Sequence, residues 1–411
     1  MPQILFRNAN LLDTQAGRTL PGHSVLVEDE RIVELREGEI RAPDAQAIDV
    51  GGRTLMPGLI DAHVHAAITT MNLAAMAQRP LTLVAIEAAK ILEGMLRRGF
   101  TSVRDAGGAD RGMAQAVERG LIAAPRLFYS GRALSQTGGH GDFGPLEDAP
   151  ALCACAIRSS GLSHVADGVS AVRKAAREEL RRGAHQIKIM ASGGVASPSD
   201  PIWNLQYSGE EMRAIVEEAQ SWRTYALAHA YTPEAISRAV EAGVRSIEHG
   251  NLLDTATAAR MHEAGAYLVP TLVTYFAIDE LGRALGCPAA SVAKVKDVLD
   301  AGLASLETAK AAGVPMGFGT DLLGETHEQQ SREFSIRAQV LSQAEILRSA
   351  TVVNAEILNR SGELGVISPG ALADLLVVDG DPLENLSLLE KQGKHLPVIM
   401  KGGQLFVNRL S

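Results

Sequence analysis

One unit recurs along residues 59–369, and it restricts the possible folds more than any other feature of the sequence. The unit is an amphipathic helix, then a glycine, then a short apolar strand that ends in a polar residue. Its copies read RRG-FTSVRD, RRG-AHQIKI, EAG-VRSIEH, EAG-AYLVPT and AAG-VPMGFGTD. Helices that alternate with short buried strands predict a parallel sheet covered by helices.

The boundaries of the helices are marked in the same repeat. Ser208 and Ser342 each precede a glutamate by three positions, which is the capping-box pattern, and Thr232 precedes a proline at a first helical position. The glycine of each copy stands where a left-handed residue would end the helix: Gly99, Gly183, Gly243, Gly265 and Gly313. These signals predict where the helices begin and end.

Eight strands are predicted in this region, ending near His65, Asp105, Ser130, Lys188, His229, His249, Thr271 and Asp321. Eight such units suit an α/β fold of the (β/α)8 TIM-barrel type, for which ~250 residues and more are typical. A doubly wound sheet is the alternative, but no glycine-rich phosphate turn follows the first strand.

The two ends of the chain differ from the middle. Segments such as SVLVEDERIVEL and LPVIMKGGQLFVN predict short strands joined by turns. We therefore expect residues 1–58 and 370–411 to pair into one small β-sandwich domain, and residues 59–369 to form the barrel.

Charge and composition exclude several classes of protein. The net charge of −9 argues against a nucleic-acid or anionic-membrane partner, since both are usually approached with a basic patch. The start MPQILFRNANLLDT contains no signal-peptide apolar region, and no apolar run has the length of a membrane span. The three cysteines, Cys153, Cys155 and Cys287, make neither a disulfide framework nor a thiolate metal set. We expect a soluble, cytoplasmic protein.

Polar side chains collect at the carboxyl ends of the predicted strands, where barrel enzymes keep their chemistry. In IDAHVHAA, His63 and His65 stand two positions apart, so a strand would direct both to one face. A histidine at a strand end is often structural, and a strand lysine can extend to solvent. Several strands that offer such groups to one rim instead predict a joint site: His63, His65, Lys188, His229, His249 and Asp321.

The residue types at this rim predict a metal site. Imidazole and carboxylate are the usual ligands of zinc and similar divalent ions. Four histidines, an aspartate and a lysine are too many for one tetrahedral zinc, and they suit two ions that share a hydroxide. An ammonium beside two cations would be repelled, so Lys188 fits only if its charge is reversed.

These residues resemble the amidohydrolase superfamily, in the subtype whose two metals are bridged by a carboxylated lysine. The matching pieces are PGLIDAHVH, the strand lysine, the two later histidines, GTD and the closing ALADLLVVDGDPL. The resemblance implies two divalent ions, expected to be zinc, and a CO2-derived carboxylate on Lys188 that bridges them. It places His63, His65 and Asp321 on one ion, and His229 and His249 on the other.

A closer resemblance is to the imidazolonepropionase-related branch with Xaa-Pro dipeptidases, Xaa-Arg/Lys dipeptidases and ochratoxin-hydrolysing amidases. It rests on SQTGGHGD, on the long segment around the strand lysine, and on AHAYTPEAISRAVEAGVRSIEHG. The resemblance implies that His140 polarises the scissile carbonyl and that Tyr231 contacts the substrate. It also implies a homo-oligomer and a small substrate, a dipeptide or N-acyl amino acid with a free C-terminal carboxylate. Proline is the first choice for its C-terminal residue, and a basic or aromatic residue is the alternative.

The hypothesis for the reaction is metal-assisted hydrolysis of an amide, with Asp321 as the proton shuttle. A one-metal deaminase would show His-x-x-Glu where this chain reads His229-Ala-Tyr-Thr. Phosphotriester and lactone hydrolases use the same metal set, so only the loops argue against them. A non-catalytic scaffold would lack ligands, and all six are present. Counting bound metal separates a scaffold with no ion, a deaminase with one ion and a binuclear hydrolase with two.

Weaker candidates surround this set. Asp61 and Asp105 could orient ligand histidines or cap turns. The stretch from Ser192 to Gly194 is expected to be a tight turn, and Lys294 and Lys296 a solvated helix face. Trp203 and Tyr207 could line the pocket or pack as core aromatics, and residues 140–167 are a candidate lid in which the Cys153–Cys155 pair is structural.

Overall fold

The computed structural model of the chain describes residues 3–76, 79–143, 162–197 and 200–410. The cysteine pair and most of the candidate lid lie outside these ranges. Within the described ranges the chain combines one mostly antiparallel sheet with two sheets of parallel strands and the helices that follow them. No described helix is both long and apolar enough to cross a membrane.

Both ends of the chain contribute to an eight-stranded sheet. The antiparallel pairing of β5 (Thr54–Pro57) with β15 (Leu375–Val378), in which Met56 lies opposite Leu376, joins the two ends. The other strands are β1 (Gln3–Asp13), β2 (Arg18–Glu28), β3 (Arg31–Glu37), β4 (Gln46–Asp49), β16 (Val398–Lys401) and β17 (Gln404–Asn408). A separate cluster of buried apolar side chains, Phe6, Val25 and Ile32 among them, gives this sheet its own core.

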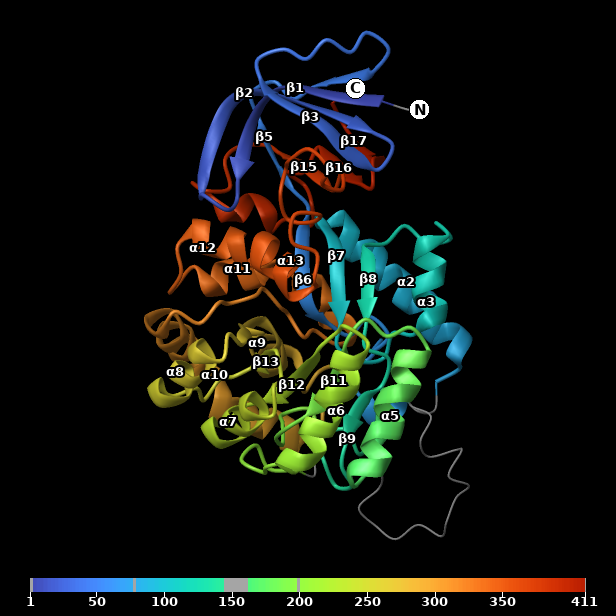
Figure 1. The fold of residues 1–411 in the computed structure, drawn as a ribbon, viewed down its shortest axis with the longest axis vertical. Helices are drawn as coiled ribbons and strands as arrows, with labels where there is room; N and C mark the ends of the chain where they lie inside the picture. Colours follow the sequence, from blue (N-terminus) through green and yellow to red (C-terminus); the bar gives the residue numbers. More distant parts are fainter. Residues whose placement is uncertain (1–2, 77–78, 144–161, 198–199, 411) are drawn as a thin grey trace.

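The middle of the chain forms the parallel strands. One sheet contains β6 (Leu59–Val64), β7 (Phe100–Asp105) and β8 (Arg126–Tyr129). The other has the order β10 (Ser163–Val165), β9 (Ala133–Ser135), β11 (Ile187–Met190), β12 (Ala226–Ala230), β13 (Ser246–His249) and β14 (Tyr267–Val269). The arrows of β7 and β8 point away from the terminal sheet, which lies at one end of the molecule (Figure 1).

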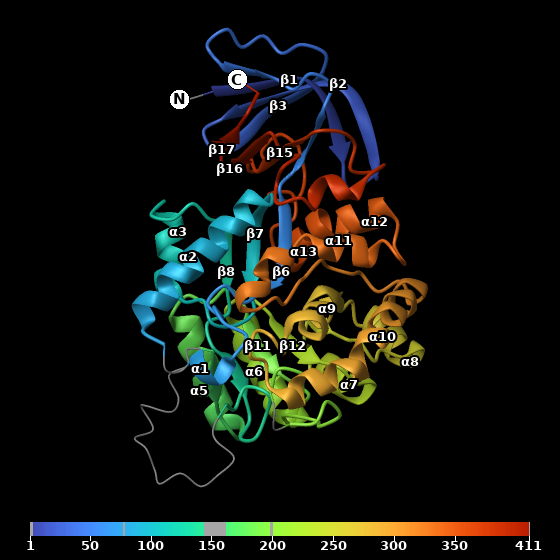
Figure 2. The same ribbon diagram turned by 180° about the vertical axis from the view of Figure 1, so that it is seen from behind.

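Helices alternate with these strands. In both views α2 and α3 lie on one side of the parallel strands, and α8 and α10 lie on the other (Figures 1 and 2). The α-helices are α1 (Leu73–Met76), α2 (Leu81–Arg97), α3 (Arg111–Glu118), α5 (Val169–Arg181), α6 (Gly209–Ser221), α7 (Pro233–Glu241), α8 (Thr255–Glu263), α9 (Leu272–Leu281), α10 (Ala289–Ala312), α11 (Arg332–Arg337), α12 (Gln343–Arg348) and α13 (Asn354–Ile357). Shorter helical turns are η1 (Gly324–Gln329), η2 (Ser349–Val353) and η3 (Leu386–Leu389).

The predicted helix boundaries are confirmed. Ser208 and Ser342 form complete capping boxes, and the Thr232 side chain accepts from the Ala235 amide at the start of α7. The five glycines predicted to end helices all have a positive φ, from 66° to 91°. Local sequence chemistry therefore fixes the helix ends in this region.

The eighth predicted strand is not a regular strand. Residues 314–321 form one bridge, between Met316 and Leu268, yet the Phe318 carbonyl accepts from the Ala62 amide of β6 at 2.8 Å. Pro315 has no N–H to donate. A Cβ added at Gly319 would lie 2.6 Å from Val269 and 2.8 Å from His63, so only bare backbone fits there. The segment lies between β6 and β14 and brings Asp321 beside His63.

Candidate metal centre and active site

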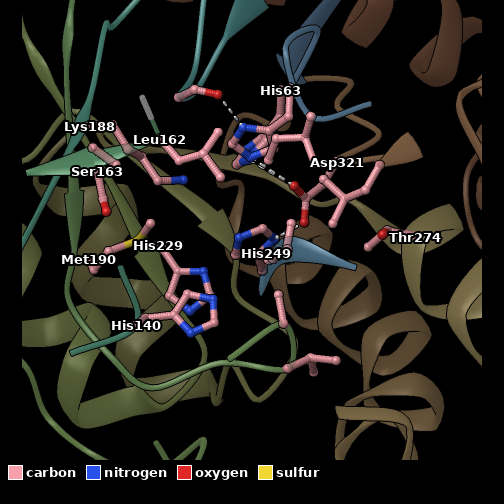
Figure 3. A pocket seen from close by; sticks show the side chains of 18 of the residues that line it. His63, His140, Leu162, Ser163, Lys188, Met190, His229, His249, Thr274 and Asp321 are labelled. Atoms are coloured by element: carbon pink, nitrogen blue, oxygen red, sulfur yellow. Dashed lines mark hydrogen bonds and ion pairs between the residues drawn. The ribbon is translucent and has the colours of Figure 1, made fainter. Parts of the chain in front are cut away.

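One pocket at the carboxyl ends of the parallel strands gathers the predicted site residues. The side chains shown in Figure 3 surround it, and they come from strands and loops far apart in the sequence. All six predicted ligands and both predicted substrate-contacting residues line it: His63, His65, Lys188, His229, His249, Asp321, His140 and Tyr231. The structure therefore brings the whole predicted set together.

The carboxylate of Asp321 lies against the histidines of β6. Its Oδ1 is 3.4 Å from Nε2 of His63 and 3.1 Å from Nε2 of His65. Ligand atoms of His63, His249 and Asp321 all lie within 4.8 Å of one another. Imidazole and carboxylate atoms at this spacing form a candidate site for a divalent ion.

The tautomers of three histidines follow from their hydrogen bonds. Nδ1 of His63 lies 2.6 Å from Oε2 of Glu248, Nδ1 of His65 lies 2.8 Å from the Gly107 carbonyl, and Nδ1 of His249 lies 2.7 Å from Oγ1 of Thr271. Carboxylate and carbonyl oxygens only accept, and a hydroxyl can accept. Nδ1 of His63 and Nδ1 of His65 therefore donate, and Nδ1 of His249 can donate to the hydroxyl in the same way, which leaves the Nε2 lone pair free for a metal.

His63 and His229 provide the test of whether a metal fits. Nε2 of His63 is buried and has no hydrogen-bond partner, which is uncommon for a buried polar atom. A metal ion beside it would supply the missing partner. His229 is turned the other way, with Nε2 3.1 Å from the Gly193 carbonyl, so Nδ1 is its nitrogen left for a ligand.

The protonation of these groups favours metal binding. Burial lowers the pKa of His229 and of His249 well below the usual value, so both imidazoles are neutral at pH 7. Burial alone would raise the pKa of the Asp321 carboxyl, but His63 and His65 outweigh it and hold the pKa well below its usual range. Neutral imidazoles and an ionised carboxylate are the forms that bind metal.

Lys188 is fully buried between these groups. Burial lowers the pKa of its ammonium from 10.5 to about 8, although Glu248 and Asp321 oppose the shift. A neutral amine, the form that reacts with CO2, is therefore accessible near neutral pH.

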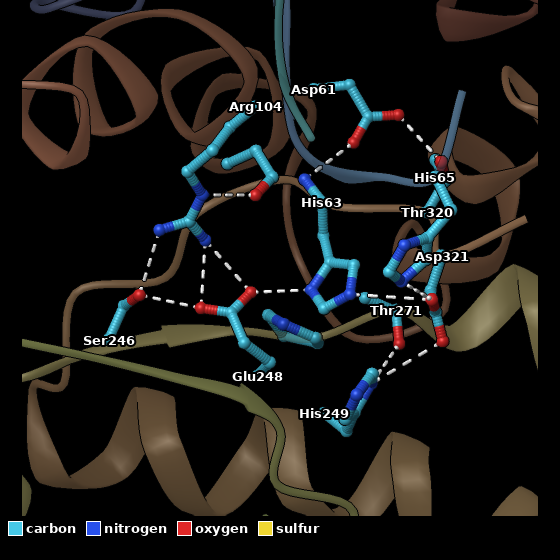
Figure 4. Close-up of polar contacts among 12 residues, drawn as sticks. Asp61, His63, His65, Arg104, Ser246, Glu248, His249, Thr271, Thr320 and Asp321 are labelled. Atoms are coloured by element: carbon cyan, nitrogen blue, oxygen red, sulfur yellow. Dashed lines mark hydrogen bonds and ion pairs between the residues drawn. The ribbon is translucent and has the colours of Figure 1, made fainter. Parts of the chain in front are cut away.

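A buried ion pair beneath His63 was not predicted from the sequence. Arg104 of β7 donates to both carboxylate oxygens of Glu248, at 2.8 and 2.9 Å, and to the Ser246 hydroxyl at 3.0 Å (Figure 4). Both charged side chains are completely buried. The signal was present in FTSVRD and SIEH, where a charged residue stands inside an apolar strand.

Asp61 and Asp105 accept from backbone amides, and Asp61 also from neutral side chains, but neither accepts a hydrogen bond from the imidazole ring of a described histidine. Asp61 accepts from the His63 amide at 3.1 Å and from the Thr320 hydroxyl at 2.7 Å, which joins β6 to the segment that carries Asp321. Asp105 accepts from three backbone amides, those of Ala66, Gly107 and Ala109. Of the two predicted roles, the structure supports ordering of turns and backbone.

His140 and Tyr231 lie on the side of the histidine cluster that His229 forms, away from the β6 histidines. The His140 ring stacks on the His229 ring, with centroids 4.4 Å apart. The Tyr231 hydroxyl is 2.9 Å from the Tyr275 hydroxyl, and burial raises the pKa of Tyr231, so it stays a neutral hydrogen-bond donor.

The weaker predictions have mixed outcomes. Tyr207 is a buried core residue whose hydroxyl donates to the Ala166 carbonyl, which is one of its two predicted alternatives. Trp203 fits neither alternative, because it is 71% exposed and is not among the described pocket-lining residues. Lys294 is not part of a solvated face, because its ammonium donates to the Gly194 and Ser197 carbonyls at 3.0 and 2.8 Å. Lys296 is exposed as predicted.

Comparison with known proteins connects this geometry to a family. Residues 54–405 match the amidohydrolase family. Ochratoxinase of Aspergillus niger is 32% identical over an alignment of 363 residues, and the alignment covers 86% of this chain and 75% of that protein. A crystal structure of an amidohydrolase is 56% identical over 100% of both chains, with a TM-score of 0.97. A crystal structure of a prolidase complexed with N-methylphosphonate-L-proline is 54% identical over 99% of this chain and 100% of that one, with a TM-score of 0.96. The chain belongs to the amidohydrolase family.

Proposed function

We propose that the chain is a binuclear zinc amidohydrolase that cleaves the amide bond of dipeptides ending in proline. The observation that carries the proposal is the gathering of the six ligand-type side chains around one pocket. In the proposed arrangement His63, His65 and Asp321 hold one ion and His229 and His249 hold the other. Lys188, carboxylated by CO2, would supply a further anionic ligand.

The proposal includes the architecture around the site. We infer that the two parallel sheets and residues 314–321 close into a (β/α)8 barrel over residues 59–369. Backbone hydrogen bonds from Leu268 to Pro315 and from Ala62 to Phe318, at 3.0 and 2.8 Å, support this closure. Residues 1–58 and 370–411 are then the composite β-sandwich domain.

The chain's own groups suit amide hydrolysis. Bound divalent ions would supply polarisation of the amide carbonyl and activation of water near pH 7. Asp321, ionised and facing the pocket, accepts the proton that the attacking water loses and delivers it to the departing amine. His140, with protons on both ring nitrogens, donates a hydrogen bond from its pocket-facing nitrogen to the carbonyl oxygen as negative charge develops on it.

The pocket lining favours an apolar residue after the scissile bond. Aliphatic and aromatic side chains line it outside the ligand set: Ile68, Leu73, Phe143, Leu162, Met190, Val195, Ile278 and Leu323. Asp321 is the one carboxylate among the described lining residues, and two histidines already hold it. A buried cationic side chain needs a partner, so this lining suits proline better than arginine or lysine.

An aromatic C-terminal residue is the second candidate. The ochratoxinase relative supports it, and the apolar lining would accept an aromatic ring. A C-terminal proline and an aromatic C-terminal residue differ in size, but both would be cleaved off by the same amide hydrolysis at this site.

A substrate panel tests the proposal. Zinc-loaded enzyme is assayed on Xaa-Pro, Xaa-Arg and Xaa-Lys dipeptides, on N-acyl aromatic amino acids, and on a phosphotriester and a lactone. We expect two metal equivalents per chain and the highest kcat/KM with Xaa-Pro. Turnover of the ester substrates alone, or one equivalent of metal, would overturn the proposal.

A further inference from the structure

The His140 imidazole is held tightly although it lies in a loop. Its ring stacks on His229 at an interplanar angle of 16°. Gly194 approaches the ring so closely that an added Cβ would lie 2.4 Å from Cε1 and 2.6 Å from Nε2. These contacts restrict the position of the ring, but they do not determine which nitrogen carries the proton.

The Asp200 carboxylate determines that Nδ1 of His140 carries a proton. Its Oδ2 lies 3.2 Å from Nδ1 of His140 and also accepts from the Gly194 amide and from Nε2 of Gln206, both at 3.1 Å. Oε1 of Gln206 accepts from the His140 amide at 2.8 Å, so the backbone and the ring of His140 are bound to the same pair. Because Oδ2 already accepts two N–H groups, Nδ1 is the donor to it and Nε2 is left for the pocket.

Lys294 of α10 holds the segment that carries Asp200. Its ammonium donates to the carbonyls of Gly194, Ser197 and Asp200, and an ammonium has three hydrogens to donate. These carbonyls belong to Asp200 itself and to two residues that precede it in the sequence. The lysine therefore fixes the backbone on which the carboxylate depends.

We propose that Asp200 is a positioning residue for His140 in amide hydrolysis, and that Lys294 positions Asp200. The carboxylate accepts from Nδ1–H of His140 and so turns Nε2 toward the substrate, where a proton on Nε2 makes it the donor to the carbonyl oxygen. None of these three residues belongs to the ligand set, so their effect falls on turnover and not on metal binding. The proposal rests on the proposed amide hydrolysis.

A double-mutant cycle tests the link between Asp200 and His140. Asp200→Ala lowers kcat by about 100-fold, as loss of one transition-state hydrogen-bond donor does. The same substitution in a His140→Ala background has no further effect, because the group it positions is absent. Asp200→Asn keeps an acceptor oxygen in place of Oδ2, and it restores kcat to within about tenfold of the parent. An equal fall in kcat in both backgrounds would show a general structural role and overturn the proposal.

Lys294→Met provides a second route in case Asp200→Ala fails to fold. We expect a fall in kcat of about tenfold that also disappears in the His140→Ala background. Lys296→Met, on the exposed side of the same helix, is the matched control and leaves kcat unchanged. All variants retain two equivalents of metal, and a loss of metal in Lys294→Met would contradict the assignment.

The protonation of Nδ1 of His140 can be measured without any turnover. Nitrogen NMR of protein labelled at histidine reports the protonated nitrogen of His140, assigned by comparison with His140→Ala. We expect Nδ1 to be fully protonated in the parent and in Asp200→Asn, and only partly protonated in Asp200→Ala. An unchanged Nδ1–H signal in Asp200→Ala overturns the proposal even if the enzyme hydrolyses no amide. Failure of the substrate panel alone would overturn only the proposed function.

Discussion

Two buried histidine–carboxylate pairs lie beside the same pocket, and they are built in opposite ways. His63 lies on β6 and Glu248 on β13, both regular strands, and Arg104 compensates the carboxylate charge. His140 and Asp200 lie on loops, and backbone and amide N–H groups hold the carboxylate. Strand β13 is paired on both sides, with β12 and β14, so its backbone N–H groups are engaged and side chains hold the Glu248 carboxylate instead. A loop has spare N–H groups and can hold a carboxylate with them.

The difference follows the demands on each histidine. A metal ligand must keep one geometry, and strands hold side chains more rigidly than loops do. A group that meets the substrate is commonly carried by a loop on a rigid scaffold. We therefore expect substitutions in the strand pair to change stability and metal affinity, and substitutions in the loop pair to change kcat.

The largest expected effect comes from Arg104→Met, which leaves the buried Glu248 charge without compensation. We expect the free energy of unfolding of the metal-free protein at pH 7 to fall by about 3–5 kcal/mol, as for other broken buried pairs. Urea denaturation measures it. Arg104→Met with Glu248→Gln removes both charges and should recover part of the loss; a double variant no more stable than the single one would contradict this explanation.

The same variant has a defined pH dependence. Burial alone would raise the pKa of Glu248, but Arg104 and His63 outweigh it and hold the pKa well below the usual range. Without Arg104 the burial dominates, so the variant's carboxyl takes up a proton as pH falls toward 4. A group whose folded pKa is raised destabilises the fold only above its unfolded pKa of about 4.3. The stability difference from the parent should therefore shrink between pH 7 and pH 4.

Glu248→Gln has a smaller effect and separates the two pairs directly. Both oxygens of Glu248 accept from Arg104, so the glutamine must turn its NH2 group against a guanidinium N–H in either orientation. The His63 imidazole loses its fixed tautomer, and zinc affinity should fall by about 10- to 100-fold. Competition with a chelator measures it. Asp200→Ala is the control and should leave zinc affinity unchanged; an equal fall in both variants would erase the distinction between the pairs.

How far the sequence alone could predict this arrangement differs between the two pairs. Position at a strand end was enough to predict His63 and the other ligand residues, because the carboxyl ends of parallel strands meet at the same edge. It could not find Glu248 as the partner of His63, since 185 positions separate them and only the fold shows which inward charges meet. Asp200 and Lys294 carry no periodic signal at all. Lys294 was predicted to be solvated because a charged residue on a helix usually is, and the fold instead places backbone carbonyls around it.

The smallest effect is expected at Thr271, which tests whether charge or only hydrogen bonding matters in holding a ligand histidine. The Thr271 hydroxyl takes the place at His249 that the Glu248 carboxylate takes at His63, at nearly the same distance of 2.7 Å. A neutral acceptor forms a weaker hydrogen bond to an imidazole than a carboxylate does. Thr271→Val keeps the shape and removes the acceptor, so zinc affinity should fall by less than about tenfold, below the range for Glu248→Gln. If chelator competition gives both variants the same loss, the hydrogen bond alone fixes the tautomer, and Arg104 serves only to stabilise the buried carboxylate.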